Sequence, residues 1–176
     1  EYGEDYYLHP EKVVDLSSRQ RTIDKVITDC FEQVVYSINQ PTGARNFQAV
    51  FWNVAYYDKY YFNSLFEHFM FPDGSKPDWN SLSWLQKRFM KWFNKERTKT
   101  VLTFPVETMA LLTKDGDVLD KEYGDFTAEM YAEGHSFFTY MSDNADSLSS
   151  CCRLRRLRNL FFSRSLRSFR LLKSSL

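Results

Sequence analysis

Apolar residues recur at helical spacing in the segment from Arg21 to Asn39. They are Ile23, Val26, Ile27, Cys30, Phe31, Val34, Val35 and Ile38. Residues three and four positions apart share one face of a helix, so this spacing predicts an amphipathic helix over 21–39. Cys30 lies on its apolar stripe, and we expect it to be a small buried hydrophobic residue. Pro41 and Gly43 then end the helix.

Residues 47–71 contain so many aromatic residues that their hydrophobic spacing does not distinguish a helix from a strand. We expect a short strand or turn near Ala49–Asn53, followed by a helix from about Asp58 to Phe69. Pro72, Gly74 and Pro77 mark a surface turn, because proline and glycine interrupt helices.

A third helix is predicted after this turn. Asp78 or Asn80 can cap its start, and we expect it to run through Arg97. Its predicted apolar face consists of Leu82, Leu85, Phe89, Met90, Trp92 and Phe93.

The segment "TVLTFPVETMALL", residues 100–112, is β-branched at its start. We predict a buried strand that is ended by Pro105, and we assign no catalytic role to Glu107. Residues 113–120 form a predicted turn, which lacks the spacing and the closing glutamate of a calcium loop.

A helix is predicted from Asp125 to Met141. Its apolar positions are Phe126, Met130, Phe137, Phe138 and Met141. Residues 142–150 are rich in Ser, Asp and Asn and form a predicted loop. Alternating strands and helices favour the α/β class.

Candidate chemistry is sparse before residue 150. The nearest approach to a metal-binding set is Glu129, Glu133 and His135, but His135 points away from both acids on a helix, so a solvated helix face is favoured. Cys151 and Cys152 end the predicted loop beside three arginines, which would favour the thiolate form of a nucleophile. Two small structural residues at the end of a loop explain the pair equally well.

Charge divides the chain. The tail from Cys151 to Leu176 holds eight basic residues and no acid, which leaves 15 basic against 23 acidic residues in the first 150, a net charge of −8. An acidic body repels the phosphate backbone, so no nucleic-acid partner is expected. No apolar run is long enough to span a membrane. Three cysteines without a secretory signal favour a cytoplasmic location.

Three long stretches carry a family resemblance. They are "SINQPTGARNFQAVFWNVAYYDKYYF", "FPDGSKPDWNSLSWLQKRFMKWFNKERTKTVLTFPVETMALL" and "DFTAEMYAEGHSFFTYMSDNADSLSSCCR". Over about Cys30 to Arg153 the chain resembles the anaerobic (class III) ribonucleoside-triphosphate reductases, which are glycyl-radical enzymes. Pyruvate formate-lyase, a related glycyl-radical enzyme, also uses adjacent cysteines and remains an alternative.

The resemblance implies a fold and a site. The fold is a ten-stranded α/β barrel with a central finger loop, of which residues 1–150 would form the N-terminal part. Cys152, directly before Arg153, is the implied thiyl radical that removes the 3′-hydrogen of the ribose, with Cys151 as the second candidate. Asn39 and Gln40 are expected to shape the barrel near the substrate; a polar pair that simply ends a helix is the alternative.

The resemblance also implies partners. They are a ribonucleoside triphosphate substrate, nucleotide effectors, a second copy of the full-length protein, and a separate activase. That activase, which depends on an iron–sulfur cluster and S-adenosylmethionine, would install the glycyl radical. Electrons would come from formate or a thiol protein. The glycyl-radical domain and its four-cysteine zinc site are missing from this sequence, so no cofactor is expected within the chain and we expect it to be inactive alone.

Residues 151–176 depart from the family pattern. "RLR" is followed at once by "RLRN", and the rest is almost entirely Leu, Ser, Arg and Phe. We expect the chain to leave the family at the start of the finger loop, through translation in a slipped reading frame. The alternative is a basic amphipathic helix on a non-enzymatic remnant, which would bind a membrane or an acidic partner.

Overall fold

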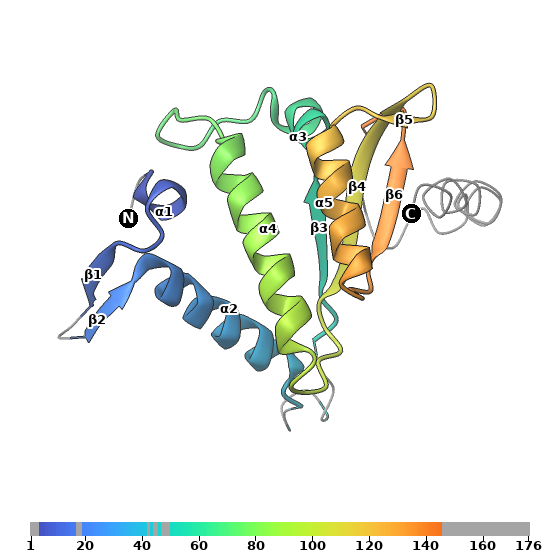
Figure 1. Cartoon of the computed structure of the whole chain (residues 1–176). Helices are drawn as coiled ribbons and strands as arrows, with labels where there is room; N and C mark the ends of the chain where they lie inside the picture. Colours follow the sequence, from blue (N-terminus) through green and yellow to red (C-terminus); the bar gives the residue numbers. More distant parts are fainter. Residues whose placement is uncertain (1–3, 17–18, 42, 44–45, 47–49, 146–176) are drawn as a thin grey trace. The chain divides into compact units, whose positions relative to one another are not determined.

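The computed structural model describes residues 4–16, 19–41, 43, 46 and 50–145, all within the unit Glu1–Asp146. These residues form a mixed α/β fold (Figure 1). The α/β class predicted from the sequence is therefore confirmed. Cys151 and Cys152, the predicted finger-loop residues and the basic tail lie outside the described residues.

The N-terminal part holds one long helix. It comprises α1 (Asp5–Leu8), the antiparallel strands β1 (Val13–Leu16) and β2 (Arg19–Thr22), and helix α2 (Ile23–Asn39). The Thr22 hydroxyl accepts a hydrogen bond from the backbone N–H of Lys25 and so caps α2. The helix predicted over 21–39 is confirmed.

Two further helices follow the prediction closely. Strand β3 (Asn53–Tyr57) leads into α3 (Lys59–Phe66), and the turn after α3 leads into α4 (Trp79–Glu96). Asp58 caps α3 and Asp78 caps α4. The predicted strand near residues 49–53 was placed too early, since β3 begins at Asn53.

Three parallel strands form the main sheet. Strand β4 (Val106–Lys114) lies between β3 and β6 (Phe138–Ser142), and the short β5 (Asp117–Val118) pairs antiparallel with the end of β4. Helices α4 and α5 (Lys121–Ala132) lie on one face of this sheet (Figure 1). The core between these layers is rich in aromatic and sulfur-containing side chains from α4, the sheet and α5: Tyr56, Phe89, Met90, Trp92, Phe93, Met109, Tyr123, Phe126 and Met130.

The position of β4 corrects one prediction. The strand expected to end at Pro105 instead begins one residue after it. Alternate positions of β4 from Glu107 to Thr113 are buried, which is the two-residue period of a strand, and the small Ala110 on the other face is buried too. Pro105 precedes the ladder, where its missing N–H costs no ladder hydrogen bond.

The segment predicted as one helix over 125–141 is a helix, a turn and a strand. Helix α5 ends at Ala132, and Gly134 takes a left-handed conformation with φ of 79°. The N–H of Gly134 bonds the carbonyl of Tyr131 and the N–H of His135 bonds that of Met130, a Schellman motif. Phe138 and Met141 belong to β6, so the predicted helical face is wrong at these residues.

Cys30 corrects another prediction, because it is exposed. It lines an apolar groove of about 380 Å³ between α2, β3 and α4, together with Phe31, Val34 and Trp52. The apolar stripe of α2 therefore faces an open groove at this point instead of a closed core. Among the helices of the described residues, none has the length and apolar character needed for a membrane span.

Candidate functional site

The carboxyl ends of β4 and β6 bring Thr113 close to Asp143, which lies at the start of the predicted cysteine loop. Parallel strands end at one edge of a sheet, the usual place for ligand sites in α/β proteins. Strand β6 ends at Ser142, and the hydroxyl of Thr113 on β4 donates a hydrogen bond to the carboxylate of Asp143. The description ends at Ala145, so the roles of Cys151 and Cys152 remain predictions.

Asp58 holds the carboxyl end of β3 against β4. Its side chain is fully buried. One carboxylate oxygen accepts a hydrogen bond from the N–H of Tyr61 at 2.6 Å, and the other accepts one from the N–H of Leu112 at 2.6 Å. Burial raises the pKa of Asp58, although the two backbone donors favour its charged form. This carboxylate is committed to backbone groups.

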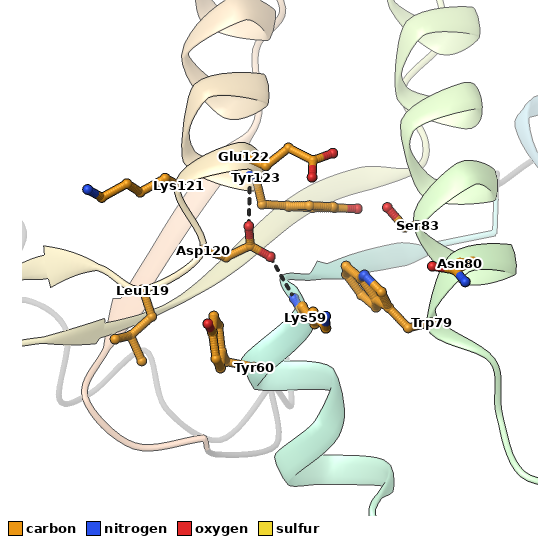
Figure 2. A pocket seen from close by; sticks show the side chains of 10 residues that line it. All are labelled: Lys59, Tyr60, Trp79, Asn80, Ser83, Leu119, Asp120, Lys121, Glu122 and Tyr123. Carbon is orange, nitrogen blue, oxygen red and sulfur yellow. Dashed lines mark hydrogen bonds between the residues drawn. The ribbon is translucent and has the colours of Figure 1, made fainter.

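A pocket of about 470 Å³ lies at the same edge, between the first turns of α3, α4 and α5. Figure 2 shows Asp120 at its centre, where the carboxylate accepts hydrogen bonds from the N–H groups of Lys59 and Tyr123, each at 3.1 Å. Helix N-termini commonly bind anions. Here the Asp120 carboxylate already takes N–H groups from two helices, and the lining residues Lys59, Lys121 and Glu122 add charges of both signs. The pocket therefore lacks the features of a phosphate cradle.

A buried polar cluster lies at the opposite end of β6. Glu107 on β4 is 3% exposed and His135 is 2% exposed. The Tyr56 hydroxyl donates a hydrogen bond to Oε1 of Glu107 at 2.5 Å, and Nε2 of His135 lies 2.8 Å from Oε2. This last approach has the distance of an ion pair without the alignment of a hydrogen bond. The other ring nitrogen of His135, Nδ1, is 3.0 Å from the amide oxygen of Asn94 on α4.

Tyr56 shows the electrostatic effect of this cluster. Burial raises the pKa of Tyr56 well above its ordinary value, and the adjacent Glu107 carboxylate adds to the shift. The phenol therefore remains a hydrogen-bond donor to Glu107. No sequence pattern predicts this cluster, because its members are far apart along the chain and none belongs to a recognisable motif.

Asn39 and Gln40 lie at the end of α2. The side-chain amide of Asn39 donates to the carbonyls of Val35 at 2.8 Å and Phe104 at 2.6 Å, and its oxygen accepts from the N–H groups of Thr103 and Phe104 at 2.9 and 3.0 Å. Asn39 thereby fixes the segment that leads into β4. The backbone N–H of Gln40 bonds the carbonyl of Tyr36. A substrate-related role for both residues remains a prediction.

Glu129, Glu133 and His135 do not form a metal-binding set. Glu129 forms an ion pair with Lys91 at 2.8 Å, whereas the ring of His135 is directed to Glu107. Across the residues that the structure describes, no group of three or more His, Cys, Asp or Glu side chains is arranged to hold a metal ion.

Comparisons with known proteins give a consistent result. Residues 5–170 match the family model described as anaerobic ribonucleoside-triphosphate reductase. The anaerobic ribonucleotide reductase from Thermotoga maritima, in a crystal structure with citrate in the active site, is 34% identical to the chain with a TM-score of 0.63. That alignment covers 70% of this chain and 22% of the Thermotoga chain.

Two further structures of the Thermotoga enzyme are similar to the chain. One has dATP bound in the specificity site and the other is in complex with dATP and CTP; each is 35% identical, with a TM-score of 0.65, over 73% of this chain and 22% of that chain. The chain thus spans about a fifth of the length of these relatives. No protein with a curated functional description matches it.

Proposed function

The chain belongs to the anaerobic ribonucleoside-triphosphate reductase family, and we propose that it is part of the catalytic barrel of such an enzyme. The match over residues 5–170 is the observation that carries this proposal. The sheet is consistent with it, because β3, β4 and β6 are parallel and α4 and α5 lie on one face (Figure 1). Residues 1–150 would then be the N-terminal part of a ten-stranded barrel.

The proposed reaction is the reduction of ribonucleoside triphosphates to deoxyribonucleotides. We assign the thiyl position to Cys152 and keep Cys151 as the second candidate, since the family resemblance places a Cys-Arg sequence at the tip of the finger loop. The relative with bound dATP and CTP supports nucleotide substrates and effectors. A radical-installing activase, a second copy of the full-length protein and a cytoplasmic location belong to the same proposal.

We propose that the chain is inactive by itself. It covers 22% of its Thermotoga relative, so most of the groups that surround a substrate would come from outside it. With three cysteines it cannot supply the four-cysteine zinc site of the family. The test is an anaerobic assay with CTP, the activase and formate or a thiol reductant, in which deoxynucleotide formation by the chain alone would overturn this proposal.

A chimera tests the cysteine assignment. The matched segment of the Thermotoga enzyme is replaced with residues 5–153 of this chain, and CTP reduction is measured after activation. We expect Cys152→Ser to abolish turnover, whereas Cys30→Ser, a matched control at the exposed Cys30 in the groove beside α2, leaves it intact. Activity that survives Cys152→Ser but not Cys151→Ser would move the thiyl assignment to Cys151.

The tail after Arg153 needs its own test. The family match runs to residue 170, whereas the Leu-, Ser- and Arg-rich composition supports a slipped reading frame. Sequencing of the encoding DNA decides whether the tail is translated in the reading frame of the family or in a slipped frame. Reductase-like codons in another frame after codon 153 are the expected result, and their absence from both other frames would overturn the slip.

A further inference from the structure

Strand β6 has little apolar packing of its own to hold it in place. It pairs with β4 in a register that joins Thr108 to Phe138 and Leu112 to Ser142. Its two largest apolar side chains, Phe138 and Met141, are 64% and 50% exposed. Register is strongly specified where one face of a strand is buried and weakly specified where it is not. Within the strand, the Thr139 hydroxyl lies 2.7 Å from the Tyr131 hydroxyl on α5. Polar contacts are therefore the features to consider for the register of β6.

The buried pair Glu107–His135 stands at the start of this pairing. Glu107 directly precedes Thr108, whose partner is Phe138, and His135 lies three residues before Phe138. The Schellman motif that ends α5 fixes the backbone of His135. The ring then enters the core, where it contacts Glu107 at 2.8 Å and Asn94 at 3.0 Å.

The buried surroundings of Glu107 and His135 disfavour any arrangement that separates the two side chains. Tyr56 from β3 occupies the other carboxylate oxygen of Glu107, and the rings of Phe93 and Phe137 pack around His135. Neither side chain can be solvated by bulk water in this arrangement, because both are almost completely buried. A buried carboxylate or imidazole without a partner is costly, so an arrangement that separates them is strongly disfavoured.

The far end of β6 carries a second polar contact. The Thr113 hydroxyl, near the end of β4, donates to the carboxylate of Asp143, the residue after β6. Polar side chains thus join β4 to the β6 segment at both ends of the ladder. The backbone ladder lies between these two contacts.

We infer that Glu107 and His135 are positioning residues that set the register of β6 on β4, with the Thr113–Asp143 contact fixing its far end. A slip of one residue would shift β6 by about 3.3 Å along β4. Only two residues separate His135 from β6, so the slip would pull His135 away from Glu107 or break the Schellman motif that holds it to α5. The same slip would send every β6 side chain to the opposite face.

The register of β6 also bears on the cysteine loop, a consequence that rests on the proposed function. Cys152 follows Asp143 by nine residues. The register of β6 therefore determines where the segment leading to the proposed thiyl position leaves the sheet. Glu107 and His135 would act on the reaction only through this placement, and neither is proposed to contact substrate.

The test measures register directly in the 176-residue chain by nuclear magnetic resonance. Nuclear Overhauser contacts between the backbones of Met109 and Thr139 report the native pairing. In the double variant Glu107→Leu, His135→Leu neither member of the pair is left in the core without the other. Only the Tyr56 hydroxyl loses its acceptor, so the double variant is made in a Tyr56→Phe background and compared with Tyr56→Phe alone. We expect these contacts to be lost or shifted by one residue, and β6 amides to exchange about tenfold faster or more.

Two controls make the result specific. Glu107→Gln keeps an acceptor for Tyr56 and an amide beside His135, so it should retain the Met109–Thr139 contacts. Gln86→Leu removes a buried polar side chain from α4 that bonds Tyr57 and Tyr123, away from β6, and should also retain them. Native contacts and unchanged exchange in the double variant would overturn the inference.

This readout does not depend on the proposed function. A lost register in the double variant together with inactivity of the chimera that carries residues 5–153 without substitutions would uphold the inference and count against the reductase proposal. A retained register together with an active chimera would do the reverse.

Discussion

Asp58 and Glu107 are both buried carboxylates, and the structure satisfies them in different ways. Asp58 accepts hydrogen bonds from two backbone N–H groups, one in its own helix α3 and one on β4. Glu107 contacts two side chains, Tyr56 from β3 and His135 from the turn before β6. Backbone donors are present whatever the sequence, whereas side-chain partners must come from chosen residues. Asp58 therefore completes local structure, and Glu107 specifies which elements meet.

The largest expected effect comes from breaking the side-chain cluster on one side only. Glu107→Leu leaves the ring of His135 and the hydroxyl of Tyr56 without their partner in the core. We expect the free energy of unfolding to fall by about 3–5 kcal/mol in urea denaturation. Glu107→Gln is the matched control, with an expected loss of about 1–2 kcal/mol. Equal losses for both variants would show that keeping the shape and the acceptor oxygen of Glu107 has no benefit, and would contradict the role given to its hydrogen bond with Tyr56.

Asp58→Ala breaks the backbone-bound carboxylate. It removes the cap of α3 and leaves the N–H of Leu112 unpaired, for an expected loss of about 2–3 kcal/mol. Amide exchange should increase at Tyr61 and Leu112 but not along β6. Faster exchange of β6 amides in this variant would contradict the local role given to Asp58.

Thr113→Val tests the far end of β6 with an almost equal side-chain volume. It deletes the hydroxyl that bonds Asp143, and we expect a loss of about 0.5–1.5 kcal/mol. The Met109–Thr139 contacts should remain, because Glu107 and His135 still hold the start of the strand. A register shift in this variant would show that the Thr113–Asp143 contact, and not Glu107 and His135, selects the register of β6.

The smallest effect is a pH dependence. Burial raises the pKa of Asp58 in the folded chain above its ordinary value of 3.8. The folded state then binds the proton more tightly than the unfolded state, so the contribution of Asp58 is greatest below pH 3.8 and is lost as the pH rises through the raised pKa. Urea denaturation across this range should show the native chain losing stability relative to Asp58→Asn. A constant difference between the two would contradict the raised pKa.

The helices could be predicted because their signals are local. The apolar period of α4 and the caps Asp58 and Asp78 are visible in a few consecutive residues. The prediction from apolar spacing was wrong for residues 125–141, because Phe137, Phe138 and Met141 also fit a helical spacing. Gly134 was the local signal for the end of α5, because its positive φ closes the Schellman motif.

The polar contacts could not be predicted, because they join residues that are distant in sequence. Asn39 bonds Phe104, and Glu107 meets His135, only after the strands and helices have packed. The exposure of Cys30 has the same origin, since whether a helix stripe meets a core or a groove depends on its neighbours. Family resemblance supplied the cysteine assignment, which no spacing in this chain indicates.

A double-mutant cycle on Glu107 and His135 tests the central distinction most directly. The free energies of unfolding of Glu107→Leu, His135→Leu and the double variant are compared with that of the native chain. Each single variant leaves the other member of the pair buried without its partner, whereas the double variant does not. The Tyr56 hydroxyl loses its acceptor in Glu107→Leu and in the double variant alike, so its cost cancels, and we predict a coupling energy of about 2–3 kcal/mol. Single losses that add to within about 0.5 kcal/mol would show that the two residues act independently, and would contradict this account.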